Sequence, residues 1–194
     1  MLQVIYIPGL GDERIAFQRL VVSLWRIWVV SPHIFHMRWS DSESYEDKFA
    51  RLTTRITMLS QNGPVALVAA SAGATAAINA CAACPQIVGV VCIAGKVNNP
   101  RSIGDGCKRR APSFWESAQH TPSALKQLTP EQKSSILSVR GRMNKIVPAQ
   151  DSIIAGAHNR VTWTAGHAFT IAAQLLLGAP FFLRFIRRRI DKKP

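Results

Sequence analysis

The sequence predicts an α/β fold, a three-layer α/β/α sandwich around a mostly parallel, six-stranded sheet. Short apolar runs alternate with longer segments whose apolar residues recur at helical spacing. The runs are continuous rather than alternating, as in strands covered on both faces. The length of 194 residues predicts one domain over 1–194, and 47% hydrophobic with 18% charged residues is an ordinary globular composition.

Six apolar runs are the predicted strands. They lie at residues 3–7, 34–39, 65–70, 88–94, 136–140 and 161–164. Strands separated by helices run parallel with right-handed crossovers, so their carboxyl ends meet at one edge of the sheet. Ligand crevices form at that edge.

Helical spacing predicts the elements between the strands. The predicted helices cover residues 12–28, 41–59, 72–84, 150–155 and 168–189. Asp41 and Ser42 are suited to an N-cap, and Pro85 follows the end of the third helix. Gly178 and Pro180 are expected to bend or break the last helix.

Residues 97–130 are predicted to form a lid-like irregular connection, because prolines and glycines recur along them. At most one short helix is expected there, near residues 123–128. A connection of this length in a compact domain is typical of a functional lid or a disordered excursion. Phe114 and Trp115 could either line an acyl pocket or anchor the connection.

Positive charge gathers in two segments. The formal net charge is +13, and residues 181–194 hold six basic side chains against one acidic one. A second basic stretch covers residues 96–110. Neither segment interleaves aromatic and basic residues, and no nucleic-acid-binding motif is present, so no nucleic-acid partner is expected. The C-terminal segment is expected to pack on the sheet as a helix with a basic end, the alternative being peripheral contact with an anionic membrane.

Sequence signals for cofactors and export are lacking. No G-x-G-x-x-G follows the first predicted strand and no P-loop motif occurs, so we expect no nucleotide cofactor. Cys81 and Cys84 have C-x-x-C spacing without a second pair, and we expect no metal. The four cysteines do not suggest a secreted scaffold, and no signal peptide is evident. These features predict a cytoplasmic location.

Ser71 carries the strongest chemical signal in the chain. It lies in the frame Ala-Ala-Ser-Ala-Gly, residues 69–73, directly after a buried strand and before a helix. A nucleophile elbow requires this arrangement, because its strained turn tolerates only small flanking residues. The alternative is an ordinary N-cap serine in an alanine-rich packing seam.

Two further loops belong at the same edge of the predicted sheet. The first strand ends in Pro-Gly-Leu-Gly-Asp, residues 8–12, which leaves the Leu10 amide free to pair with that of Ala72 as two oxyanion donors. The same turn could equally be an ordinary glycine-rich strand–helix connection. His167 follows the last predicted strand, where a general base is expected to lie.

Taken in order, PGLGD (8–12), AASAG (69–73), GRMNKIVP (141–148) and AGHA (165–168) resemble a small serine hydrolase of the α/β-hydrolase superfamily, esterase- or lipase-like, over nearly the whole chain. The resemblance implies a minimal α/β-hydrolase fold without the first two strands of larger members. It places the second strand outside the first and the third inside. It also implies Ser71 as nucleophile, His167 as base, Leu10 and Ala72 as oxyanion donors, and no cofactor.

The triad acid departs from this resemblance. Asn144 stands where such hydrolases carry an aspartate, and an amide cannot neutralise an imidazolium. Three interpretations follow: Asn144 orients the histidine, another carboxylate takes over, or the protein binds without catalysing. The candidate carboxylates are Asp105, Asp151 and Asp12. We rank Asn144 as the orienting residue first.

The predicted function is a serine hydrolase that cleaves a carboxylic (thio)ester of a small molecule through an acyl-enzyme. The alternative is a catalytically impaired binding protein of the same fold. A third hypothesis is a peripheral membrane protein that acts on lipids and docks through its basic C-terminal segment.

Overall fold

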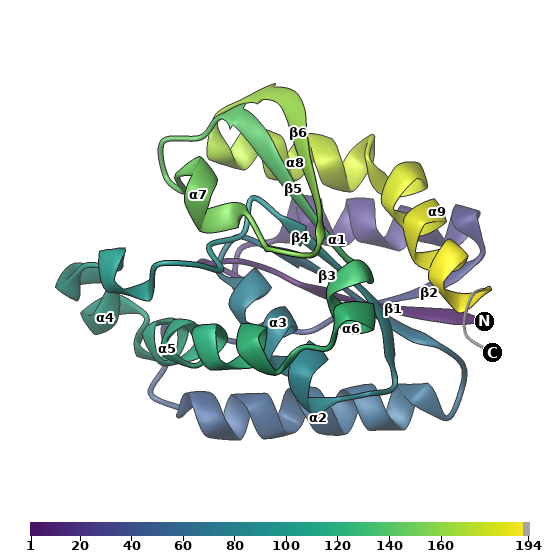
Figure 1. Ribbon diagram of the computed structural model, residues 1–194, viewed down its shortest axis with the longest axis horizontal. Coiled ribbons are helices and arrows are strands. Elements are labelled where there is room, and N and C mark those ends of the chain that lie inside the picture. The colour runs from purple at the N-terminus through teal and green to yellow at the C-terminus, as the bar shows by residue number, and fades with distance from the viewer. Residues whose placement is uncertain (192–194) are drawn as a thin grey trace.

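The computed structural model describes residues 1–191, which form one parallel sheet between two helical layers (Figure 1). The strands are β1 (Leu2–Ile7), β2 (Val30–Ile34), β3 (Val65–Ala70), β4 (Ile87–Ile93), β5 (Ile136–Met143) and β6 (His158–Ala165). Their order is β2-β1-β3-β4-β5-β6, and every neighbouring pair is parallel. The predicted fold class is confirmed, as is the predicted order of the first three strands in the sheet, with the second outside the first and the third inside.

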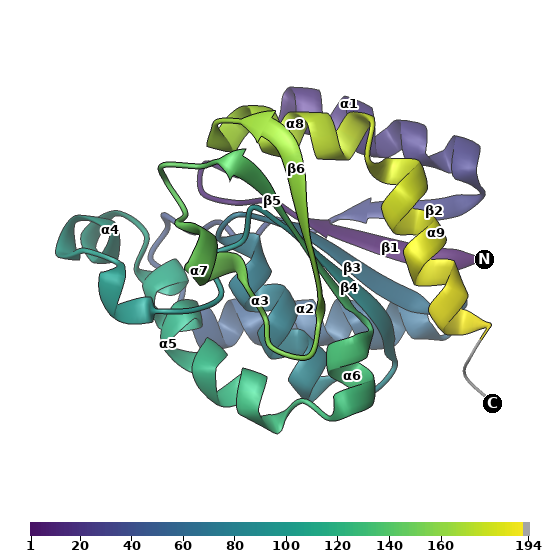
Figure 2. The ribbon, with the colours of Figure 1, turned by 45° about the horizontal axis from the view of Figure 1, so that its top comes forward.

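One helical layer consists of α1 (Ala16–Ser23), η1 (Leu24–Trp28), α8 (His167–Leu176) and α9 (Ala179–Ile190). The other consists chiefly of α2 (Tyr45–Ser60), α3 (Gly73–Ala83) and α5 (Pro112–Gln127). Figure 2 shows the two layers on opposite faces of the sheet. Shorter helices complete the chain: η2 (Pro100–Ser102), α4 (Asp105–Arg110), α6 (Pro130–Ser134) and α7 (Ala149–Ser152).

Each face of the sheet has its own hydrophobic core. Alternate side chains of β1 separate the two, since Ile5 and Ile7 pack toward α2 and α3 while Val4 and Tyr6 pack toward α1 and α9. All six residues of β1 and of β3 are buried. Burial on both faces explains why these strands are continuous apolar runs in the sequence.

The prediction of an irregular connection over residues 97–130 is wrong. Three helices occupy most of it, and α5 alone is 16 residues long. Pro112 stands at the start of α5, where a missing N–H costs nothing, and Pro122 is tolerated inside it. The buried face of α5 places Ser117 and Thr121 beside Phe114, Ala118 and Ala124, so the hydrophobic periodicity of this helix is weak.

The second strand begins earlier than predicted. It covers Val30–Ile34 instead of residues 34–39, and it is an edge strand, which tolerates Pro32. Met37 and Trp39 are fully buried although they lie outside any strand, and Trp39 Nε1 donates to the Pro8 carbonyl at 3.2 Å. Both belong to the β2–α2 connection, and their side chains are part of the hydrophobic core on that face of the sheet.

The last predicted helix is broken where expected, into α8 and α9, which meet at a bend of 65°. Helix α9 buries Phe182, Leu183 and Ile186 against the sheet, as the packed-helix interpretation predicts. Within the described residues no single helix is long and apolar enough to cross a membrane; α8 and α9 pass that test only as a bent pair. The end of the basic segment, residues 192–194, lies outside the described part of the chain.

Candidate active site

Ser71 lies in the tight turn between β3 and α3 and has a left-handed backbone with φ of 50°. Its neighbours must be small. A Cβ on Gly73 would lie 2.3 Å from the Ile7 carbonyl oxygen, and a Cβ on Gly9 would lie 2.8 Å from Ser71 Cβ. The glycines therefore let the end of β1 press against the turn, which holds the serine side chain at the carboxyl edge of the sheet.

His167 is the first residue of α8 and faces Ser71. Its Nε2 lies 2.9 Å from Ser71 Oγ, within hydrogen-bond distance. Gly166, with φ of 86°, turns the chain between β6 and α8, and its N–H donates to the Met143 carbonyl. That bond ties the histidine turn to the end of β5, where Asn144 follows.

Asn144 occupies the third place in this chain of contacts. Its Nδ2 lies 3.0 Å from His167 Nδ1. Its Oδ1 accepts from the backbone N–H groups of Ile146 and Val147, both at 3.1 Å. Turning the amide over would aim its NH₂ group at those two donors, so the loop backbone selects the orientation in which NH₂ faces the imidazole.

None of the three candidate carboxylates is hydrogen-bonded to His167 within residues 1–191. Asp151 is buried and pairs with Lys96 at 2.5 Å, and Asp12 Oδ2 accepts from the Arg38 N–H at 2.7 Å. Asp105 is exposed in the first turn of α4. Among the described residues, Asn144 is the side chain hydrogen-bonded to His167 Nδ1.

The two expected oxyanion donors flank Ser71 in the fold. Leu10 lies in the turn after β1 and lines the cavity beside Ser71, while Ala72 is the N-cap residue of α3. Neither amide donates a hydrogen bond within residues 1–191. Their role as oxyanion donors stays a prediction.

Comparison with known proteins gives matches in structure only. No protein-family model matches the sequence, and no curated protein does. A monoacylglycerol lipase from Paleococcus ferrophilus superposes with a TM-score of 0.68 at 14% identity, covering 96% of this chain and 94% of the lipase. Est1E from Butyrivibrio proteoclasticus gives 0.69 at 13% identity, covering 98% and 88%. The ydeN gene product of B. subtilis gives 0.67 at 16% identity, covering 99% and 100%.

This chain has the α/β-hydrolase fold. The near-complete coverage of the neighbours confirms the fold that the sequence motifs implied. At these identities the likeness concerns the fold, and the chemistry must be argued from the residues of this chain.

The orientation of the Asn144 amide determines which nitrogen of the neutral His167 imidazole carries the proton. Because the NH₂ group donates, neutral His167 accepts at Nδ1 and bears its proton on Nε2, toward Ser71 Oγ. A general base needs the opposite tautomer, with a lone pair at Nε2. Burial of the imidazole also lowers the pKa of His167, which favours the neutral ring.

A cavity of about 500 Å³ adjoins the serine and histidine. Phe17 and Gln18 of α1 and Ile171 and Ala172 of α8 form its sides. Leu10 and Ile146 reach it from the loops, and it is chiefly apolar. The cavity can hold a small acyl group or a similar apolar ligand against Ser71.

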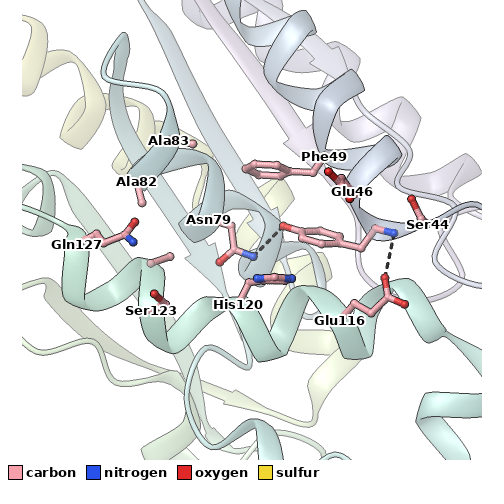
Figure 3. A pocket seen from close by; sticks show the side chains of 12 residues that line it. Ser44, Glu46, Phe49, Asn79, Ala82, Ala83, Glu116, His120, Ser123 and Gln127 are labelled. Carbon is pink, nitrogen blue, oxygen red and sulfur yellow. Dashed lines mark hydrogen bonds between the residues drawn. The ribbon is translucent and has the colours of Figure 1, made fainter.

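A second cavity, of about 600 Å³, lies between α2, α3 and α5 (Figure 3). Asn79 Nδ2 donates to the Tyr45 hydroxyl at 2.7 Å, and His120 stacks on the Tyr45 ring with centroids 5.7 Å apart. No hydrogen bond within residues 1–191 joins His120 to a nucleophilic side chain. This cavity is separate from Ser71 and lacks a nucleophile–base pair.

Phe114 and Trp115 do not line the cavity at Ser71. Phe114 is buried edge-to-face on Trp39 at 5.8 Å, and Trp115 lies under Lys108 at 4.3 Å. They anchor α4 and α5, the second of the two roles considered.

In the described residues, no group of three or more His, Cys, Asp or Glu side chains is placed to hold a metal ion.

Sequence reasoning predicted Ser71, His167 and Asn144, which the structure brings into contact, but it missed how Asn144 is held. The backbone N–H groups of Ile146 and Val147 decide which end of the amide meets the imidazole. Backbone donors leave no trace in residue types, so no sequence signal could have revealed them.

Proposed function

We propose that this protein is a serine hydrolase that cleaves a carboxylic ester or thioester of a small molecule through an acyl-enzyme intermediate. The observation that carries the proposal is the contact of 2.9 Å between His167 Nε2 and Ser71 Oγ beside an apolar cavity. A nucleophile within hydrogen-bond reach of a base is the requirement for acyl transfer. A monoacylglycerol lipase and an esterase domain among the structural neighbours agree with ester chemistry.

In the proposed reaction Ser71 Oγ attacks the carbonyl carbon and His167 Nε2 takes the hydroxyl proton. The N–H groups of Leu10 and Ala72 donate to the oxyanion of the tetrahedral intermediate. The C–O or C–S bond then breaks, and the leaving alcohol or thiol takes the proton from His167. A water molecule, deprotonated by the same nitrogen, hydrolyses the acyl-serine and restores both side chains.

Asn144 makes this cycle slow. The base form of His167 needs its proton on Nδ1, where it would face the Asn144 NH₂ group. Exposing Oδ1 instead would break the two backbone hydrogen bonds to that oxygen. An aspartate-to-asparagine change in a serine triad lowers kcat by about 10⁴, because it favours the wrong tautomer. We therefore expect weak turnover of activated esters.

The same tautomer favours a second candidate function, a binding protein. With the proton on Nε2, the imidazole and the Leu10 and Ala72 amides are all donors around Ser71. Such a site suits a ligand whose ester or carboxylate oxygens accept hydrogen bonds while its apolar part fills the cavity.

Labelling with a fluorophosphonate probe separates the two functions. The wild-type chain should be labelled at Ser71, because Ser71 Oγ displaces fluoride from phosphorus. Ser71→Ala and His167→Ala should not be labelled, whereas Ser60→Ala, at the end of α2, should label like wild type. A folded wild-type chain that is not labelled would contradict the hydrolase and favour the binding protein.

A further inference from the structure

The helical layer made of α1, η1, α8 and α9, called here the α1–α9 layer, is continuous. Helix α1 contacts α8, α8 contacts α9, and α9 contacts η1. Trp25 Nε1 donates to the Leu175 carbonyl at 3.0 Å, and Arg187 donates to the Trp28 carbonyl. Figures 1 and 2 both show these helices side by side on one face of the sheet.

The outward side of this layer is unusually apolar. Its exposed large side chains include Leu20, Leu24, Ile27, Phe169, Leu176 and Phe181. Leu20 is 61% and Ile27 71% exposed. Across α2, α3, α4 and α5, within the described residues, Met58 is the exposed side chain of this class. Exposed apolar side chains gathered over one layer mark an interaction surface.

The charges of the layer have one sign. Its four helices contain six arginines and no aspartate or glutamate. Arg19, Arg26, Arg184 and Arg188 are exposed. Apolar side chains bordered by arginine, without acidic residues, match a surface that is negatively charged and has an apolar interior, which describes an anionic lipid bilayer.

The cavity beside Ser71 adjoins this surface. Phe17 of α1 and Ala168 of α8 line the cavity and are exposed. Leu10 and Ile146, which also line it, are 49% and 68% exposed. Exposed apolar side chains of α1 and of two loops therefore border the cavity on the side of this layer.

We propose that the α1–α9 layer docks on an anionic lipid surface, so that the Ser71 cavity opens toward the bilayer and receives the acyl chain of a lipid ester. The choice of substrate rests on the proposed hydrolase function, whereas docking does not. This surface differs from the C-terminal segment alone, because the apolar side of α9 is packed on the sheet and the exposed apolar residues lie mainly on α1, η1 and α8.

Vesicle sedimentation tests the docking. The chain should sediment with vesicles of phosphatidylcholine and phosphatidylglycerol, less with phosphatidylcholine alone, and less at high salt. Leu20→Ser with Ile27→Ser should weaken binding about tenfold or more, while Met58→Ser, on the opposite layer, should not. Arg19→Gln with Arg26→Gln should weaken it about fivefold per arginine, whereas Arg109→Gln with Arg110→Gln, on α4, should not.

Several outcomes would overturn the proposal. Absence of sedimentation with the anionic vesicles is one, and equal binding by the layer variants and their controls is another. A dimer in analytical ultracentrifugation that Leu20→Ser with Ile27→Ser dissociates, without vesicle binding, would assign the surface to a second copy of this chain. Circular dichroism confirms that each variant is folded, since exposed substitutions change stability little.

Labelling of Ser71 keeps the two proposals apart. A chain that is labelled by the fluorophosphonate but does not sediment contradicts docking alone. A chain that sediments but is not labelled contradicts the hydrolase alone and leaves a lipid-binding protein.

Discussion

The two helical layers differ in where their polar groups lie. In the layer of α2, α3 and α5, polar side chains are buried between the helices. Asn79 Nδ2 donates to the Ser117 carbonyl, and Thr75 Oγ1 lies 2.7 Å from Ser117 Oγ. Lys48 is fully buried and reaches Asp41 at 2.6 Å and Ser113 at 2.9 Å. This layer is joined by specific, directional contacts.

The α1–α9 layer packs with aromatic and aliphatic contacts instead. Trp25 meets Tyr6 and Phe182 edge-to-face, with ring centroids 6.1 and 5.3 Å apart. Four of its six arginines and many of its large apolar residues are exposed, and α1 and α8 border the Ser71 cavity. One layer thus uses polar groups to define its packing, and the other keeps polar and apolar groups available to a ligand or surface.

From this difference we expect the residues that determine stability and the residues that determine the chemistry at Ser71 to lie in different parts of the fold. Substitutions in the buried polar contacts of α2 and α5 should change the free energy of unfolding and leave the chemistry at Ser71 intact. Substitutions around α8 should do the reverse. The following experiments test that separation.

The largest effect is expected from Asn144→Asp. A carboxylate would accept from His167 Nδ1 while its other oxygen keeps the two backbone hydrogen bonds, so the base tautomer becomes the stable one. The kcat for a short activated ester should rise about 10³- to 10⁴-fold. The midpoint of thermal unfolding should change little.

Asp151→Asn is the control for that change. It removes the partner of Lys96, so it should lower stability without lowering kcat. Unchanged kcat in Asn144→Asp, or a large loss of kcat in Asp151→Asn, would show that Asn144 does not hold the acid position.

Lys48→Met tests the buried polar contacts in the layer of α2, α3 and α5. It keeps an unbranched side chain of nearly the same length but leaves the Arg38 carbonyl and Asp41 without their buried donor. The free energy of unfolding in urea should fall by about 2 kcal/mol, while the labelling rate of Ser71 stays the same.

Arg51→Met provides the matched control, because Arg51 pairs with Glu43 at 2.6 Å on the exposed side of α2. Its cost should be below about 1 kcal/mol. A slower labelling rate of Ser71 in Lys48→Met would show that the buried contacts of α2 affect the chemistry at Ser71. It would contradict the separation of stability and function between the two layers.

The pH dependence of labelling should report His167 alone. Burial lowers the pKa of His167 below its ordinary value of 6.5, and only the neutral ring can accept a proton. The labelling rate should therefore rise with pH through an inflection below pH 6.5 and stay level at neutral pH.

In Asn144→Asp, the carboxylate stabilises the imidazolium, so the inflection should move to higher pH. A profile that Asn144→Asp does not shift would mean that residue 144 has no contact with the titrating group.

The smallest effect is expected from Asp105→Asn. Asp105 is exposed on α4, so the substitution should leave kcat within about twofold and stability within about 0.5 kcal/mol. Ester kinetics and urea unfolding measure both. A large loss of activity would place this carboxylate at the site and contradict the geometry.

Much of the fold could be read from local patterns. Strand β3 and helix α3 follow from a buried apolar run and an alanine-rich segment, and both lie within a residue or so of their predicted bounds. Helix α5 escaped prediction because its buried face carries Ser117 and Thr121, which hydrogen-bond to α3 or within α5. A polar residue is recognised as buried only once its partner is known.

Like the fold, the candidate site could be predicted only in part from the sequence. Ser71 and His167 could be named from the residues around them, because a strained turn needs small neighbours and parallel strands end at one edge. The identity of the acid position was also visible, since Asn144 is plainly an amide.

By itself, the sequence determined the strand–helix alternation, the serine in its small-residue frame and the excess of basic residues, because each depends on neighbouring residue types. Only the tertiary structure decided that α1, η1, α8 and α9 form one cationic, apolar layer, and that Asn144 offers its NH₂ group to His167. Both depend on distant segments and on backbone donors, whose positions exist only after the chain has folded.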